Sequence, residues 1–393
     1  MSVWDGIVGQ RSVIKTLEQA ASDLSKTTQS WLFVGPEGVG RSRLALAFAA
    51  ALECPDHGDG ICTSCREVMA GISPDVTVLA TDQVAIPIED VRALVDSSEQ
   101  MPSTGAWRIV IISDISRIAE RATNVLLKEI EEPALRTIWI LCAPSLQGVL
   151  PTILSRVRTV RLSLPSDEDV AHYLESATEG REPVPKNIAR RAARLAQGNV
   201  DLAFRYASDP EAIACRDRLV EELLRTSSAF EATIFADKLV EWVQRQAQDA
   251  ADEHVSRAQR EFLEQQGYDS DNGRLAKMES AVRAQYDHLG AAAEKKRLAT
   301  RLTRDMFDRI LDDAASVYRD VEIVHAHAQD AIGLLNREQR DAVVALAGSI
   351  TRAEALDRVE AISIARRRLH GNGMLPLVFE ALVCRLTRRC LSK

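Results

Sequence analysis

The chain has 393 residues, which at roughly 100–200 residues per domain predicts more than one folding unit. Hydrophobic residues make up 46% and charged residues 27%, so the composition excludes a disordered chain and a fibrous repeat. The net charge of −8 argues against a protein that coats nucleic acid or an anionic membrane by bulk charge. Any contact with DNA is therefore expected to be local or shared with other subunits.

No apolar run approaches the roughly 18–20 residues that span a bilayer. The first ten residues also lack the basic start and the apolar stretch of a signal peptide. We therefore expect a cytoplasmic protein with no membrane partner.

Strand-like apolar runs alternate with helix-like segments in the first part of the chain. A helix pattern covers 12–17, and an alanine-rich helix over 44–52 follows the first apolar run. The expected strands are short, apolar and followed by turn or helix signals, and they cover 31–34, 76–79, 109–112 and 138–141. This alternation predicts a parallel sheet covered by helices.

Proline is distributed unevenly along the chain. Twelve of the 13 prolines lie between Pro36 and Pro210, and none occurs from Glu211 to Leu375. At a background of about 5%, about eight would be expected in that stretch, so this part is predicted to be all helix. Its segment 241–300 carries 11 acidic and 9 basic residues, which indicates a charged helical hairpin broken near Gly267–Gly273.

A glycine-rich turn between the first strand and the alanine-rich helix fits the phosphate-loop pattern G-x4-G-K-[ST] everywhere except at the lysine. In such a loop, backbone N–H groups cradle phosphates, the lysine reaches the β and γ oxygens, and Ser or Thr holds magnesium. Arginine is longer and forked, so it does not reproduce a compact ammonium. The pattern favours a degenerate loop over a hydrolysing site, and its residues are Gly35, Gly38, Gly40, Arg41 and Ser42.

A second change affects the expected magnesium site. An acidic pair should follow the strand over 109–112, but Ser113 and Asp114 stand there instead. Serine cannot replace the charge of the first carboxylate, so magnesium binding is impaired independently of Arg41. Hydrolysis of ATP by this chain alone is therefore not expected.

Three of the seven cysteines, Cys54, Cys62 and Cys65, cluster after the alanine-rich helix. In a reducing compartment this spacing indicates a metal site rather than disulfides. No H-E-x-x-H motif accompanies the cluster, so a structural zinc is favoured over a catalytic one. Three free thiols are the alternative.

Three motifs carry a family resemblance: Ile7–Gln10, Asn124–Pro133 and Leu150–Val157. Over about residues 1–207 they resemble the clamp-loader branch of the AAA+ ATPases, and the degenerate loop resembles that of the delta-prime subunit family of bacterial DNA polymerase III. The resemblance implies an α/β AAA+ P-loop domain over 1–161 with a zinc-binding insertion. A small helical lid over 162–207 and an all-α collar over 208–393 would follow, with the charged hairpin inside the collar.

The resemblance implies a stator subunit that helps load the sliding clamp onto primed DNA. Its expected partners are the gamma/tau and delta subunits, with the clamp and DNA contacted through the complex. Ser155 and Arg156 match the family's Ser-Arg pair, so Arg156 would act as an arginine finger on a neighbour's nucleotide. The alternative is an active motor subunit of the gamma/tau type.

The family's zinc module has four cysteines, and here the second is replaced. Aligning Cys65 with the family's last cysteine places Asp59 at that position. Zinc accepts carboxylate oxygen and imidazole nitrogen, so either Asp59 or His57 could complete the ligand set with the three cysteines.

Overall fold

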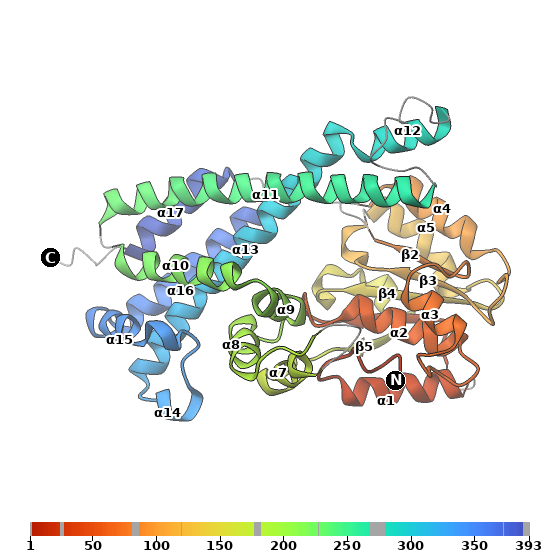
Figure 1. Ribbon diagram of the computed structural model, residues 1–393, viewed down its shortest axis with the longest axis horizontal. Coiled ribbons are helices and arrows are strands. Elements are labelled where there is room, and N and C mark those ends of the chain that lie inside the picture. Colours follow the sequence, from red (N-terminus) through yellow and green to blue (C-terminus); the bar gives the residue numbers. More distant parts are fainter. Residues whose placement is uncertain are drawn as a thin grey trace. The chain divides into compact units, whose positions relative to one another are not determined.

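The computed structural model describes residues 2–23, 27–80, 86–118, 120–176, 182–226, 228–266, 280–371 and 373–387. They form two compact units, Met1–Ile213 and Ala214–Lys393 (Figure 1). Within the described ranges, no helix is both long and apolar enough to cross a bilayer. The expected break near 267–273 lies outside the described residues.

The first unit contains a five-stranded parallel sheet with the strand order β2-β3-β4-β1-β5. Its strands are β1 (Ser30–Val34), β2 (Val76–Leu79), β3 (Arg108–Ile112), β4 (Thr137–Ala143) and β5 (Arg158–Arg161). The predicted parallel sheet is confirmed, and β1, β3 and β4 are buried along their whole length, as continuous apolar runs require. Sequence analysis did not identify β5, because this edge strand buries only Val160.

Side chains of β1 alternate between the two faces of the sheet. Trp31 and Phe33 lie in one core cluster, and the ring centroids of Trp31 and Phe48 are 5.1 Å apart. Leu32 and Val34 lie in the cluster on the other face. Each face is covered by helices. Helix α1 (Arg11–Ser22) precedes β1, and the helices between the strands are α2 (Arg41–Glu53), α3 (Thr63–Met69), α4 (Ile88–Ser98), α5 (Glu120–Glu131) and α6 (Pro151–Leu154).

Three helices complete the first unit: α7 (Asp167–Glu175), α8 (Lys186–Ala196) and α9 (Val200–Ser208). Ser166 caps the start of α7, because its side chain accepts a hydrogen bond from the Asp169 N–H. Asn199 caps α9 in the same way, accepting from the Leu202 N–H. These helices share a small alanine-rich core that includes Val8 from the start of the chain.

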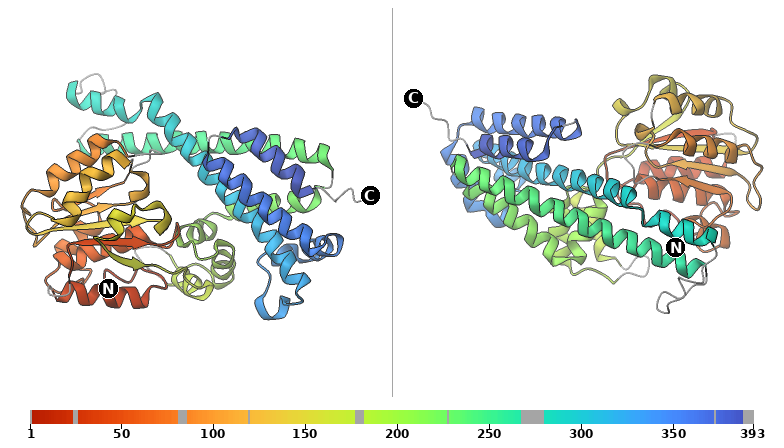
Figure 2. Two further views of the ribbon diagram at one scale, coloured as in Figure 1. Left: turned by 180° about the vertical axis from the view of Figure 1, so that it is seen from behind. Right: turned by 90° about the horizontal axis from the view of Figure 1, so that it is seen from above.

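The second unit is helical throughout its described residues, as the proline gap predicts (Figure 2). Its two longest helices, α11 and α13, pack along each other and contribute to one apolar core with α16 and α17. Phe307 and Phe379 are fully buried there, with ring centroids 4.1 Å apart. The helices are α10 (Pro210–Arg225), α11 (Ala229–Gln265), α12 (Ser280–Leu289), α13 (Ala292–His325), α14 (Gln329–Ile332), α15 (Arg340–Ser349), α16 (Arg352–His370) and α17 (Leu375–Thr387).

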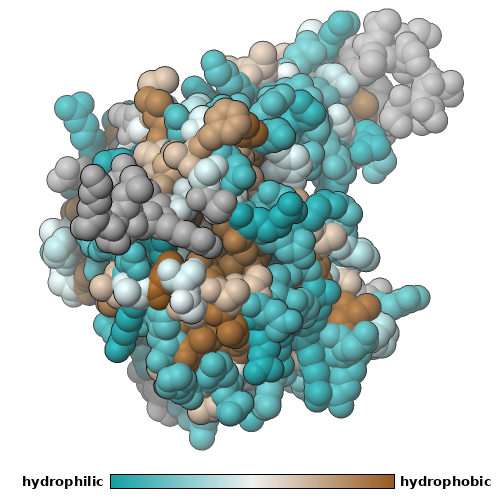
Figure 3. Space-filling model, turned by 90° about the vertical axis from the view of Figure 1, so that its left-hand side faces the viewer, coloured by the Kyte–Doolittle hydropathy of each residue, from teal (hydrophilic) through white to brown (hydrophobic). Residues whose placement is uncertain are grey.

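A buried polar network joins α10 to α13 in this unit. The Arg216 guanidinium donates to Asp313 at 2.8 Å and to the Asn336 side chain at 2.7 Å. Asn336 in turn donates to Asp320, which is fully buried. The outer surface of the unit is mixed, with apolar side chains among hydrophilic ones (Figure 3). Phe230 is one of the exposed apolar residues.

Candidate functional site

The glycine-rich turn lies at the carboxyl end of β1, which sits between β4 and β5 in the sheet. The Gly35 N–H donates to the Ala143 carbonyl at the end of β4, which fixes the start of the turn. Gly40 is the N-cap of α2 and has φ 88°, a left-handed conformation that favours glycine. The turn therefore presents the N-terminus of α2 at the crossover point of a parallel sheet, where ligands of such folds bind.

The loop is covered by the start of α9. Gly38 has φ 74°, and a methyl group at this position would run into the Asn199 side chain. The Val200 N–H donates to the Gly38 carbonyl at 2.7 Å. Gly38 is therefore required both by its backbone conformation and by the close approach of α9.

Arg41 replaces the lysine of the pattern and lies half-buried at the first position of α2. Its guanidinium Nη1 is buried and has no hydrogen-bond partner among the described residues. Burial raises the pKa of Cys142 to about 12, while the charges of Arg41 and Asp114 act on that thiol in opposite directions. Arg41 and Asp114 therefore lie close enough to the end of β4 for their charges to act there, and an unpaired buried guanidinium N–H at this edge suits an anion.

Asp114, the expected magnesium ligand, is engaged by its own turn. One carboxylate oxygen accepts from the Ser116 N–H at 3.0 Å and from the Ser116 hydroxyl, and the other accepts from the Arg117 Nε at 3.1 Å. These bonds cap the short helix η2 (Ile115–Arg117). These bonds hold the carboxylate on its own turn, and because Ser113 stands beside it, Asp114 is the single acid of the expected pair that is present for magnesium. Ser42, in the first turn of α2, is exposed.

Arg156 lies just beyond α6 with 34% of its side chain exposed. Its Nε donates to Glu131 at the end of α5 at 2.8 Å, and its Nη1 donates to the Thr152 carbonyl and the Ser155 hydroxyl. Glu131 is itself 54% exposed. The guanidinium is thus held in one orientation at the surface of the first unit. The sequence offered no signal for Glu131, which lies 25 residues away.

The structure brings Cys54, Asp59, Cys62 and Cys65 together, with one ligand atom of each within 4.8 Å of the others. The Cys54 Sγ lies 3.6 Å from the Cys62 Sγ and 3.6 Å from an Asp59 oxygen. His57 is exposed and does not belong to this group of four. Of the two candidates for the fourth ligand, Asp59 is therefore the one placed with the cysteines.

The two separations of 3.6 Å that involve the Cys54 Sγ are close to the edges of a tetrahedral metal site. With zinc bonds of about 2.3 Å to sulfur and 2.1 Å to oxygen, a tetrahedron has S···S edges of about 3.8 Å and S···O edges of about 3.6 Å. Backbone N–H groups of Ile61 and Cys62 lower the pKa of Asp59 to about 2, so this carboxylate is ionised at neutral pH. Burial raises the pKa of Cys65, whose thiol would lose its proton on binding a metal. The donor set of three sulfurs and one carboxylate suits zinc.

A loop near this group is anchored by two buried carboxylates that sequence analysis missed. Asp75 accepts hydrogen bonds from the backbone N–H groups of Ser103, Thr104 and Gly105, at 2.6 to 2.7 Å. Glu53 accepts from the next two N–H groups along the chain. Five successive backbone donors before β3 are therefore satisfied by two acids that lie far apart in the sequence.

Residues 9–166 match the family described as "DNA polymerase III, delta subunit". The chain is 28% identical over 174 residues to DNA polymerase III subunit gamma of Buchnera aphidicola subsp. Schizaphis graminum, covering 43% of this chain and 47% of that protein. It is 29% identical over 195 residues to DNA polymerase III subunit tau of Escherichia coli K12, covering 48% of this chain and 30% of that protein. The chain thus spans less than half the length of each of these relatives.

Among solved structures, a gamma subunit-related protein from Thermotoga maritima aligns with 91% of this chain and 99% of its own, at 16% identity and a TM-score of 0.35. The sequence matches to the delta-subunit family and to gamma and tau subunits support the expected resemblance to clamp-loader proteins of DNA polymerase III.

Proposed function

We propose that the protein is a stator subunit of a clamp loader, because residues 9–166 match the delta-subunit family of DNA polymerase III and the relatives are gamma and tau subunits. In this role it does not hydrolyse ATP, and it supplies Arg156 to the nucleotide site of a neighbouring gamma/tau-type subunit. This subunit, the gamma/tau-type subunits and a delta subunit would together load the sliding clamp onto primed DNA.

The observation that carries this proposal is the contrast between Asp114 and Arg156. Asp114 is held by its own turn and Ser113 replaces the other acid of the expected pair, so the chain's own site has one carboxylate where magnesium binding is expected to need two. Arg156 is held at the surface, and an exposed ion pair such as that with Glu131 stabilises by only about 0–1 kcal/mol. A neighbour's phosphate can therefore replace Glu131 at little cost. An arginine supplied in this way raises the rate of nucleotide hydrolysis by a factor of about 10³–10⁵.

The test is co-purification with gamma/tau and delta subunits, followed by measurement of the DNA-stimulated ATPase of the complex. Arg156→Ala should assemble normally and lower the turnover at one site by a factor within the range of about 10³–10⁵. Arg161→Ala, at the exposed end of β5, is the matched control and should leave turnover unchanged. Unchanged ATPase with Arg156→Ala would contradict the arginine-finger role, and failure to co-purify would contradict the stator role.

A second candidate is a motor subunit, because the relatives reported above are gamma and tau subunits. The unpaired Nη1 of Arg41 also offers a donor for a phosphate oxygen. ATP turnover by the isolated chain, lost in Arg41→Ala and retained in Arg41→Lys, would favour this function. Nucleotide binding without turnover would favour the stator, with the loop acting as a binding site only.

We further propose that Cys54, Asp59, Cys62 and Cys65 hold a structural zinc ion. Their fit to a tetrahedron and the ionised Asp59 support this assignment. The ion would tie the end of α2 to the start of α3, across a segment rich in glycine and aspartate.

Elemental analysis of the purified chain should find about one zinc per molecule. Cys62→Ser should lose the metal and lower the thermal stability of the first unit, whereas Cys384→Ser in the second unit should do neither. Full metal content in an Asp59→Ala variant would contradict the role of Asp59, and a metal-free native chain would contradict the site.

A further inference from the structure

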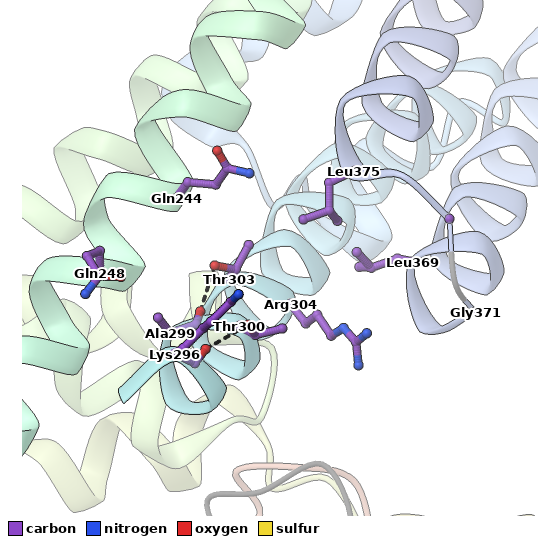
Figure 4. Close-up of a pocket in the computed structure, with 11 residues that line it drawn as sticks. Gln244, Gln248, Lys296, Ala299, Thr300, Thr303, Arg304, Leu369, Gly371 and Leu375 are labelled. Carbon is purple, nitrogen blue, oxygen red and sulfur yellow. Dashed lines mark hydrogen bonds between the residues drawn. The ribbon is translucent and has the colours of Figure 1, made fainter. Parts of the chain in front are cut away.

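A pocket in the second unit lies between α11, α13 and the connection from α16 to α17, and it is separate from all the sites above (Figure 4). Its volume is about 450 Å³, within the roughly 300–1,000 Å³ typical of ligand sites. Gln244 and Gln248 face it from α11, and Lys296, Thr300 and Arg304 face it from α13. No acidic residue is among the residues that line it.

The positive charges of the pocket are not neutralised within the described part of the chain. Lys296 and Arg304 take part in no ion pair with a described residue, although both lie on a helix with many acidic residues. The acids close to them in sequence have other partners, since Glu294 pairs with Arg297 and Asp305 pairs with Arg301. Across the groove, Asp252 of α11 pairs with Lys295.

The spacing on α13 places these groups in a row. Lys296, Thr300 and Arg304 follow one another at intervals of four residues, so they lie on one face of the helix about 6 Å apart. That interval is similar to the distance between successive phosphates of an extended single strand. The amides of Gln244 and Gln248 face the same space from α11, also at an interval of four.

We propose that this groove binds the sugar–phosphate backbone of single-stranded DNA, with Lys296 and Arg304, about 12 Å apart along α13, contacting alternate phosphates and Thr300 lying at the phosphate between them. The identification of the ligand as DNA rests on the proposed function. That the ligand is an anion is inferred from the groove itself. A duplex about 20 Å wide does not fit a pocket of this size, whereas one strand does. Because no aromatic side chain lines the pocket, stacking of bases contributes nothing, and binding should be indifferent to sequence.

The experiment measures fluorescence anisotropy of a labelled oligothymidine of about 15 nucleotides with the full chain, over a range of about 50 to 200 mM salt. The double variant Lys296→Gln/Arg304→Gln should weaken binding about tenfold or more. It should also reduce the slope of log affinity against log salt by about 1.4, because each phosphate contact of a single strand contributes about 0.7. An abasic oligonucleotide of the same length should bind like oligothymidine.

The matched control is Lys295→Gln/Arg301→Gln, which removes the same charge from the same turns of α13 but from residues that already pair with Asp252 and Asp305. It should change the affinity less than threefold. Equal losses in both double variants, or no binding by the native chain at low salt, would overturn the proposal. Displacement by tripolyphosphate beyond that caused by chloride at equal ionic strength would support the phosphate contacts, because tripolyphosphate carries the same anionic groups.

These outcomes are independent of the stator role. Both double variants should still co-purify with the other subunits and support ATPase that depends on Arg156. Loss of co-purification by the native chain would contradict the proposed function, while binding of the oligonucleotide by the chain alone would remain measurable.

Discussion

Asp75 is the residue whose replacement should destabilise the first unit most specifically. Its side chain is 1% exposed and accepts the backbone N–H groups of Ser103, Thr104 and Gly105, together with the Thr104 hydroxyl. Asp75→Asn keeps the shape of the side chain and replaces one acceptor oxygen by a donor. The Ser103 N–H would then face the new amide N–H₂ and lose its partner.

The cost can be estimated in two ways. A buried donor left without a partner costs about 1–3 kcal/mol, and the remaining bonds lose the additional strength that the charge confers. Independently, the hydrogen bonds that hold the ionised form lower the pKa of Asp75 from 3.8 to about 2, which corresponds to about 2 kcal/mol in favour of the carboxylate. We therefore expect Asp75→Asn to lower the free energy of unfolding of the first unit by about 2–4 kcal/mol.

The first unit can be followed on its own by tryptophan fluorescence. Four of the five tryptophans lie in it, and a Trp242→Phe background removes the fifth. Urea unfolding at neutral pH would be compared between Asp75→Asn and Asp96→Asn, which changes an exposed aspartate on α4. A cost no greater than that of Asp96→Asn would refute the reasoning.

The sign of the pH dependence gives a further check on Asp75. Because its pKa in the folded protein is lowered, the stability that its charge provides is present above about pH 4 and is lost as the pH falls toward about 2. Asp75→Asn should lack that part of the acid-induced loss. An equal loss in both proteins across this interval would contradict the assignment.

Two further predictions concern the other regions. Burial raises the pKa of Asp313 to about 6 despite the adjacent Arg216, so the second unit should lose stability as the pH rises from about 4 to 6, by up to about 3 kcal/mol. Asp313→Asn should abolish this dependence of stability on pH, which urea unfolding at several pH values, followed by Trp242 fluorescence, would measure. A pH dependence unchanged by the substitution would contradict the prediction. Gly38→Ala should lower the free energy of unfolding of the first unit more than Gly71→Ala does. Both glycines have a positive φ, but of the two only Gly38 is in contact with another side chain, that of Asn199. Equal losses of stability in urea unfolding would show that the contact with α9 contributes nothing.

The sequence was sufficient to predict the elements whose signal is local. Apolar runs located β1 to β4, and the absence of proline indicated the helical second unit. The edge strand β5 was not predicted, because Val160 is its only buried residue and no apolar run marks the strand. Its pairing with β1 is set by the whole sheet and not by its own composition.

The parts of the sites that could not be predicted depend on contacts between distant residues. Spacing grouped the three cysteines, but only the turn after α2 decides that Asp59 lies with them while His57 is exposed. Glu131 meets Arg156, and Asp75 meets the loop before β3, across 25 or more residues. An acid in such a position has no distinctive neighbours in the sequence, so a buried anchor cannot be distinguished there from an exposed charge.

The degenerate nucleotide site is altered unequally at its two ends. At the phosphate end, the turn keeps the left-handed Gly38 and Gly40, and Arg41 adds a buried N–H without a described partner. At the metal end, Asp114 uses both oxygens to cap η2. Ser113 also stands where the first acid of the magnesium pair is expected, so a lysine at position 41 alone should not restore hydrolysis. A site of this kind can hold an anion as a structural element while the chemistry takes place in a neighbouring subunit.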